Sequence, residues 1–204
     1  MKKIVISLNR RQDRKKEFKK NNLKDFKYLK AIDYKTLDNK DFKVDENFRD
    51  PFKNRPVLKS EVACFLSHKK AWEECLRLYE PVIILEDDAV INETWDEKYY
   101  EELIDEYDFI YLQRNENEPD KVVSIDDRIE KPSYPYNLTG YVIGPTTATQ
   151  LLHNYKEIIP VDEYVPSLIK KDRINAVALK HDACNQLPRS VSESDIENNT
   201  IARN

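Results

Sequence analysis

The sequence predicts an α/β fold, a Rossmann-type mixed sheet flanked by helices in a single compact domain. Strand-length apolar runs alternate with helix-length amphipathic segments through all 204 residues. The run at residues 82–85 is unbroken and follows Pro81, which is typical of a strand buried in a parallel sheet. No repeat or linker divides the chain, whose length suits one domain.

Each element is predicted from its own pattern. We expect strands over residues 3–8, 26–32, 82–85, 108–113, 138–144 and 175–179. Helices are expected to about residue 21, from an N-cap at Ser60, over 95–107, from Pro145 and from Pro160. The remaining segments are expected as a long loop over 34–56, loops over 114–120 and 133–137, a hairpin over 122–131 and a polar tail over 182–204.

Three consecutive acids, Glu86, Asp87 and Asp88, follow the buried strand. Ligands bind at the carboxyl ends of strands in open α/β sheets. Adjacent carboxylates repel one another, and a divalent cation is the simplest neutraliser. Alternation along an extended chain would point Glu86 and Asp88 to one side, so that they could share one ion. The alternative is a solvated turn at the end of a strand.

Charge is unevenly distributed along the chain. Residues 1–59 carry 19 basic and 9 acidic side chains, whereas the rest carries 15 and 29. A basic segment beside an acidic cluster suits an anionic ligand such as a nucleotide diphosphate, with a metal ion between them. Nucleic acid is a second possibility, and a simply solvated basic surface is the third.

Glycine is rare, which limits how phosphates can be held. Gly140 and Gly144 are the only glycines in the sequence, so a P-loop and a GxGxxG fingerprint are excluded. Bound phosphates would need side chains such as Arg10, Arg11 or Arg14 together with a metal. Gly140, inside a predicted strand, indicates a close approach to the backbone.

The cysteines and the apolar runs bear on the compartment. Cys64 and Cys75 lie about three helical turns apart and cannot pair, and we find neither a CxxC motif nor a histidine at ligand spacing from a cysteine. Reduced thiols, and the lack of a membrane-length apolar run or a signal peptide, predict a soluble, cytoplasmic protein. His68, at the edge of an apolar stripe, fits either a core or a functional histidine.

Seven short motifs, taken in order, resemble glycosyltransferase family 25, which includes bacterial lipooligosaccharide galactosyltransferases and collagen galactosyltransferases. The motifs cover nearly the whole chain. They are Ile6-Ser7-Leu8-Asn9-Arg10-Arg11-x-Asp13-Arg14, Ala31-Ile32-Asp33, Glu61-x-x-Cys64-x-x-Ser67-His68-x-x-Ala71-Trp72, Leu85-Glu86-Asp87-Asp88, Gly140-Tyr141-Val142-Ile143, Pro160-Val161-Asp162-Glu163 and Ser194-Asp195-Ile196.

The resemblance implies a GT-A fold, a UDP-sugar donor (usually UDP-galactose), an Mn²⁺ or Mg²⁺ ion and inversion at the anomeric carbon. The triple acid stands in place of the family's DxD-like motif. By this resemblance Asp88 would bind the metal, and Glu86 would bind the metal or the ribose. Asp87 would contact the sugar or a group that itself binds the metal. The residues that match motifs at the nucleotide end are Asn9, Arg10, Arg14, Ala31 and Asp33. Asp33 would accept a hydrogen bond from the uracil or ribose. The residues that match the helix motif, to which no firm role is assigned, are Glu61, Ser67 and His68.

The resemblance also implies a division of labour along the domain. Residues 1–80 would hold the nucleotide, residues 81–183 the metal and acceptor, and residues 184–204 a tail. Asp162 is the first choice for the base that deprotonates the acceptor, with Asp195 as the runner-up; the structural alternatives are a first-turn helix acid and a tail residue.

The acceptor stays open at this point. A glycan, a lipid-linked lipopolysaccharide core, a hydroxylysine-like residue or, with less support, a hydroxylated base in nucleic acid would fit. The chain departs from the family pattern at Ser60 and Ala63, where glycines usually flank the helix glutamate.

Two other functional classes fit the acids. A metal-dependent phosphohydrolase or nuclease would use them without a donor sugar. A non-catalytic nucleotide- or glycan-binding module would bind without turnover. The oligomeric state is not predicted.

Overall fold

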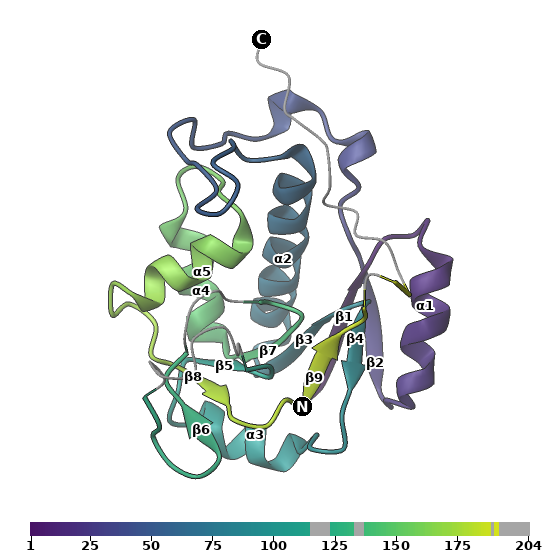
Figure 1. Cartoon of the computed structure of the whole chain (residues 1–204), viewed down its shortest axis with the longest axis vertical. Helices are drawn as coiled ribbons and strands as arrows, with labels where there is room; N and C mark the ends of the chain where they lie inside the picture. The colour runs from purple at the N-terminus through teal and green to yellow at the C-terminus, as the bar shows by residue number, and fades with distance from the viewer. Residues whose placement is uncertain (115–122, 133–136, 189, 192–204) are drawn as a thin grey trace.

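The computed structural model describes residues 1–114, 123–132, 137–188 and 190–191. It confirms the predicted α/β class. A mixed seven-stranded sheet has the order β2-β1-β3-β7-β5-β8-β6, and helices lie on both of its faces (Figure 1).

The elements follow the predicted order with shorter bounds. The strands of the main sheet are β1 (Lys2–Ser7), β2 (Phe26–Lys30), β3 (Val82–Glu86), β5 (Phe109–Tyr111), β6 (Ile129–Glu130), β7 (Gly140–Ile143) and β8 (Ala176–Leu179). The helices are α1 (Gln12–Phe18), α2 (Lys59–Leu78), α3 (Glu97–Ile104), α4 (Pro145–Asn154) and α5 (Val161–Ile169), with 3₁₀ turns at Lys19–Asn21, Tyr34–Thr36 and Asn39–Asp41.

Strand direction divides the sheet in two. Strand β1 pairs in parallel with both β2 and β3, so their carboxyl ends meet at one edge. Strand β7 then runs antiparallel between β3 and β5. The buried strand predicted before the acids is therefore parallel on one side only, and the acids lie at the edge where ligands bind in such sheets.

Alternation along β3 builds two apolar layers. Val82 and Ile84 pack with α2, α4 and α5 on one face. Ile83 and Leu85 pack with α1 and α3 on the other. All four side chains are fully buried. This accounts for the continuous apolar run, because a strand covered on both faces has no polar side.

Helix α2 begins before the predicted N-cap, Ser60, which is a correction. Its N-cap is Leu58, and Ser60 is a buried residue within the first turn. The Leu58 backbone N–H donates to Glu61 Oε2 at 2.7 Å. A glutamate three residues into the helix thus satisfies the N-cap backbone, as in a capping box, without a polar N-cap side chain.

The segment predicted as a polar tail contains a strand, which is a second correction. Strand β9 (Cys184–Gln186) pairs antiparallel with β4 (Ala89–Ile91), the apolar run that follows the acids. The buried Ala183 and Cys184 anchor this segment in the core. One polar-looking strand of three residues carries too little periodicity for prediction.

The predicted hairpin is confirmed by an antiparallel bridge between Ser124 and Glu130, and β6 also pairs with β8. The predicted loops over 114–120 and 133–137 fall largely outside the described residues. The three cysteines are free, and the reducing compartment stays a prediction. Among the described residues, we find no helix with the length and apolar character needed to span a bilayer.

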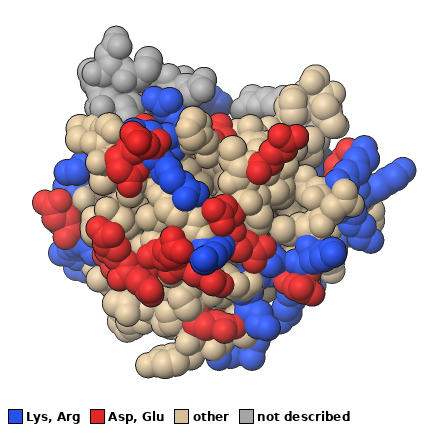
Figure 2. Space-filling model, turned by 90° about the horizontal axis from the view of Figure 1, so that it is seen from below, with Lys and Arg blue, Asp and Glu red and all other residues tan. Residues whose placement is uncertain are grey.

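Acidic side chains gather on the face formed by α3 (Figure 2). The start of the chain neutralises part of this charge. Lys3 Nζ lies 2.7 Å from Glu97, and the terminal amine lies 3.0 Å from Glu101. Some of the basic groups at the amino terminus are therefore paired with acids of the later, acidic part of the chain.

Gly140 confirms the predicted close approach. A Cβ at this position would lie 2.4 Å from Cys184 Sγ and 3.0 Å from Leu85 Cδ2. At Gly144, by contrast, an added Cβ would meet no atom within 4 Å among the described residues. Gly140 thus leaves room for the Cys184 side chain beside β7.

We expect Gly140→Ala to destabilise the protein by about 1–3 kcal/mol, because overpacking a full core forces neighbouring groups to move. Denaturant unfolding measures this change in the free energy of unfolding, with Gly144→Ala as the matched control. Adding Cys184→Ala should recover part of the loss. Equal stability of the two glycine variants would contradict the assigned clash.

Candidate functional site

The three acids line a pocket that opens to solvent at the carboxyl ends of β1, β2 and β3. Segments distant in the sequence meet there. The polar lining consists of Arg14, Tyr34, Ser60, Cys64, Ser67, His68, Glu86, Asp87, Asp88 and Gln186, and the apolar lining of Ile6, Leu8, Ala31, Ile32 and Ala63.

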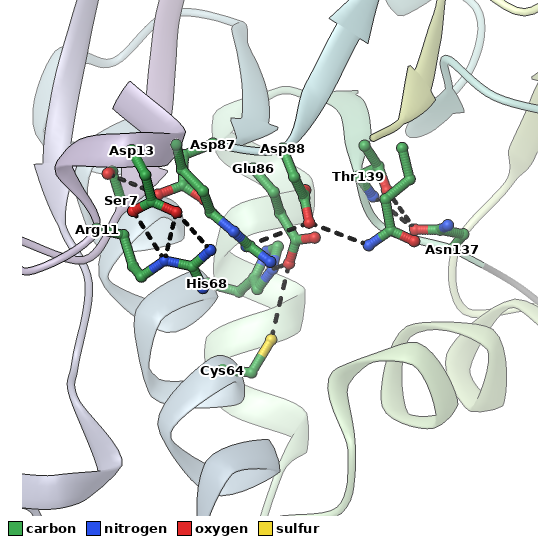
Figure 3. Close-up of polar contacts among 12 residues, drawn as sticks. Ser7, Arg11, Asp13, Cys64, His68, Glu86, Asp87, Asp88, Asn137 and Thr139 are labelled. Atoms are coloured by element: carbon green, nitrogen blue, oxygen red, sulfur yellow. Dashed lines mark hydrogen bonds and ion pairs between the residues drawn. The ribbon is translucent and has the colours of Figure 1, made fainter. Parts of the chain in front are cut away.

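Asp87 and Asp88 share one arginine. Arg14 Nη1 lies 3.2 Å from Asp87 Oδ1 and 3.2 Å from Asp88 Oδ2. Ser7 Oγ, at the end of β1, donates to Asp87 Oδ2 at 2.7 Å (Figure 3). The expected alternation of the acids does not hold, because the chain turns at residues 87 and 88 instead of continuing as an extended strand.

Asp88 retains one unsatisfied oxygen. Gln186 Nε2 donates to its Oδ2 at 3.2 Å. Its Oδ1 is buried and has no hydrogen-bond partner among the described residues. Burial and the nearby Glu86 charge raise the pKa of Asp88 to about 6. A buried carboxylate with a vacant acceptor is ready to ligate a cation.

Glu86 contacts two side chains of helix α2. Its Oε1 lies 3.2 Å from His68 Nε2 and 3.8 Å from Cys64 Sγ (Figure 3). Burial and the Asp87 charge raise the pKa of Glu86 to about 7. Burial likewise raises the pKa of the Cys64 thiol.

A buried hydrogen-bond chain fixes His68. Trp72 Nε1 donates to Tyr141 Oη at 2.9 Å, and Tyr141 Oη lies 2.9 Å from His68 Nδ1. Each ring nitrogen of His68 thus faces one partner, Nδ1 the Tyr141 hydroxyl and Nε2 the Glu86 carboxylate. Burial lowers the pKa of His68 to about 4. His68 is therefore both a core histidine and part of the pocket wall.

Asp162 lies in the first turn of α5 and is not among the residues that line the pocket. It lies close enough to Glu86 for the charge of that residue to act on it. Its carboxylate accepts a hydrogen bond from the Leu138 backbone. Burial, followed by the Glu86 charge, raises the pKa of Asp162 to about 7.

The other predicted nucleotide contacts divide into two groups. Arg14 and Ala31 line the pocket. Arg10 Nε instead donates to Asp33 Oδ2 at 2.6 Å, and Asp33 Oδ1 accepts from the Lys35 backbone. This pair holds the loop after β2. Asn9 is exposed, and its carbonyl accepts from Gln12.

Two residues of the helix motif support the pocket from behind. Ser67 Oγ donates to the Ala63 carbonyl and accepts from the Ile32 backbone at 2.8 Å, which joins α2 to the loop after β2. The Glu61 carboxylate accepts hydrogen bonds from both terminal nitrogens of Arg55, at 2.9 and 2.8 Å, and also caps α2. The structure gives Glu61 no place on the pocket lining.

Sequence reasoning missed Cys64 and Gln186. The statement that no histidine stands at ligand spacing from a cysteine is wrong, because Cys64 and His68 are four residues apart on one helical face and, with Glu86, form a possible metal-binding group. That spacing was a usable signal. Gln186 had none, since only tertiary pairing of β9 places it. Asp195 lies outside the described residues.

The raised pKa values predict how stability depends on pH. Glu86, Asp88 and Asp162 hold protons more tightly in the folded state, so their contribution is present at low pH and lost as pH rises from about 4 to about 7. His68, with its lowered pKa, acts in the opposite sense.

We expect Glu86→Gln to flatten the fall in unfolding free energy between pH 5 and about 7, measured by denaturant unfolding of metal-free protein. The exposed Glu102→Gln on α3 is the control and should leave the slope unchanged. An unaltered slope in Glu86→Gln would rule out the raised pKa.

Comparison with known proteins gives a consistent result. The sequence pattern of glycosyltransferase family 25, described as an LPS biosynthesis protein family, matches residues 1–165. A glycosyltransferase 25 family member of Anopheles gambiae is 35% identical over 129 residues, 58% of this chain and 22% of its own length. Procollagen galactosyltransferase 1-B of Xenopus laevis is 30% identical over 192 residues, 84% of this chain and 31% of its own.

Among solved structures, a glycosyltransferase involved in the glycosylation of the major capsid of PBCV-1 has a TM-score of 0.45 at 12% identity, covering 89% of this chain and 80% of its own. The chain spans less than a third of the length of the two relatives above. Because the family pattern matches most of the sequence, from the first strand through the three acids to Asp162, the chain belongs to glycosyltransferase family 25.

Proposed function

We propose that this chain is a metal-dependent inverting glycosyltransferase that moves a hexose, galactose or glucose, from a UDP-sugar to an acceptor hydroxyl. The observation that carries the proposal is the convergence of Arg14, the triple acid and the ends of three parallel strands on one open pocket. Family membership supports the class of reaction.

The acids fit a divalent cation. Asp88 Oδ1 is a buried acceptor without a hydrogen-bond partner in the described structure, and Asp87 lies beside it. Carboxylate oxygens suit Mn²⁺ or Mg²⁺. Asp88, with Asp87 or Glu86, would hold the ion, which when bound would neutralise the charge of the diphosphate leaving group.

The donor would lie along the carboxyl ends of β1 and β2. Arg14 presents a guanidinium to this pocket, and Ala31 and Ile32 form an apolar wall beside it. The Arg10–Asp33 pair fixes the adjoining loop. A carboxylate can accept more than two hydrogen bonds, so Asp33 could still accept one from the uracil or ribose, as proposed. Side chains, rather than a glycine-rich loop, would therefore hold the phosphates.

Asp162 would act as the base. As the acceptor oxygen attacks the anomeric carbon, its proton passes to the Asp162 carboxylate and its electron pair forms the new glycosidic bond. The bond from the anomeric carbon to the diphosphate oxygen breaks on the opposite face, with its electron pair leaving on the diphosphate. A pKa of about 7 suits a base near neutral pH.

The acceptor is proposed by class. The family description and the related procollagen galactosyltransferase support a glycan, a lipid-linked glycan or a hydroxylysine-like residue. The basic amino-terminal segment would favour an acceptor that carries negative charge. A hydroxylated nucleic-acid base has less support.

Nucleotide binding gives the first test. With Mn²⁺ present, UDP-galactose or UDP-glucose at 100 times its Kd should stabilise the protein by about 2.7 kcal/mol, measured by thermal unfolding. Asp88→Asn should lose this gain, whereas Asp25→Asn, an exposed aspartate in a turn, should keep it. If no UDP-sugar stabilises the protein, the donor is wrong, and cleavage of phosphodiesters becomes the next assay.

The base is tested by Asp162→Asn. With a UDP-sugar and an accepted hydroxyl compound, kcat should fall by about 10²–10⁴-fold while the donor-induced thermal shift persists. Glu163→Gln, the neighbouring acid of the same helical turn, is the matched control and should retain activity. Full turnover in Asp162→Asn would transfer the role of base to another residue.

A further inference from the structure

Three unlike metal-binding side chains meet on the wall of the pocket. Cys64 and His68 come from successive turns of α2, and Glu86 ends β3. The Cys64 sulfur, a His68 ring nitrogen and a Glu86 carboxylate oxygen all lie within 4.8 Å of one another. All three residues also line the open pocket.

We propose that Cys64, His68 and Glu86 form a second cation site, one that binds Zn²⁺ and is separate from the oxygen ligands offered by Asp87 and Asp88. The proposal rests on the geometry and chemistry of these side chains and does not depend on the transfer reaction.

Two of the three distances between ligand atoms are close to those around a tetrahedral ion, and the third, from Cys64 to His68, is at most 4.8 Å. Zinc bonds of about 2.3 Å to sulfur and about 2.0 Å to nitrogen and oxygen place tetrahedral ligands about 3.3–3.6 Å apart. Cys64 Sγ lies 3.8 Å from Glu86 Oε1, and His68 Nε2 lies 3.2 Å from the same oxygen. Three protein ligands with one open position are the usual arrangement of an accessible zinc site.

Ligand type separates this site from the acids beside it. A thiolate and an imidazole favour Zn²⁺ and Co²⁺, whereas Mg²⁺ and Mn²⁺ prefer oxygen ligands. Asp87 and Asp88 offer only oxygen, and both contact Arg14. Glu86 is the residue at which the two sets adjoin, because its Oε1 faces Cys64 and His68.

The surroundings of His68 supply an orienting contact. His68 Nδ1 lies 2.9 Å from Tyr141 Oη, and Nε2 lies 3.2 Å from Glu86 Oε1. On binding, Cys64 releases its thiol proton to solvent, and the neutral imidazole carries its proton on Nδ1. The Nδ1–H then donates to Tyr141 Oη, the kind of second contact that orients histidine ligands.

The site gives zinc a means of regulating the enzyme. An ion held there would occupy the pocket in which the UDP-sugar is proposed to bind. Zinc should therefore compete with the donor, an outcome that, unlike binding itself, rests on the proposed function.

Co²⁺ is the probe, because it replaces Zn²⁺ and its bond to a thiolate gives a charge-transfer absorption band. We expect the full chain to bind one equivalent of Co²⁺ with this band, and added Zn²⁺ to remove it. Excess Mg²⁺ should leave it in place.

Cys64→Ser should abolish the band and weaken Zn²⁺ binding by more than about 100-fold, since losing a ligand costs more than losing a hydrogen bond that orients a ligand. Cys75→Ser is the matched control, because Cys75 is a buried cysteine of the same helix that lies outside the group. His68→Gln should weaken binding similarly, and it provides a second variant if Cys64→Ser does not fold.

A band that persists in Cys64→Ser, or is lost in Cys75→Ser, would overturn the proposal, as would a wild-type protein that shows no thiolate band with Co²⁺. These measurements use no nucleotide or sugar. Zinc binding without any transferase activity would therefore leave this site standing and remove only the proposed function, and the reverse result would do the opposite.

Discussion

The structure depends on how three consecutive carboxylates are accommodated at the end of a buried strand. Burial without partners would be costly for any one of them, and each therefore meets a different set. Glu86 meets His68 and Cys64, Asp87 meets Ser7 and Arg14, and Asp88 meets Arg14 and Gln186. Helix α2, the ends of β1 and β3, and the late strand β9 are all fixed relative to one another by these contacts.

The repulsion that remains is useful chemistry. Burial raises the pKa values of Glu86 and Asp88, and repulsion between neighbouring acids adds to the effect because one guanidinium offsets it only in part. A cluster in this condition gains from binding a cation. Asp162 belongs to the same electrostatic group, because the Glu86 charge contributes to its raised pKa. The proposed metal site and the proposed base are therefore linked through one carboxylate.

The fold class and the order of elements could be predicted from the sequence. The unbroken apolar run at residues 82–85 and the apolar stripe of α2 both follow directly from which side chains are buried. The position of the three acids at the end of a buried strand was also predicted, and the close approach at Gly140 is confirmed. The sequence did not predict β9, the Leu58 cap or the Arg10–Asp33 pair. Each of these depends on a tertiary contact or on a main-chain group. Neither kind of contact produces a periodic pattern in the sequence.

The return of β9 to the acids sets the order in which the site can be completed during synthesis. The Leu187 backbone N–H donates to the Asp88 carbonyl, and Gln186 donates to the Asp88 side chain. About a hundred residues separate these partners, and a chain emerging from the ribosome at roughly 5–20 residues per second would need several seconds to bring them together. For that interval Asp88 lacks both contacts. Because β8 ends at Leu179, only seven residues before Gln186, the main sheet and this wall of the pocket are completed almost together.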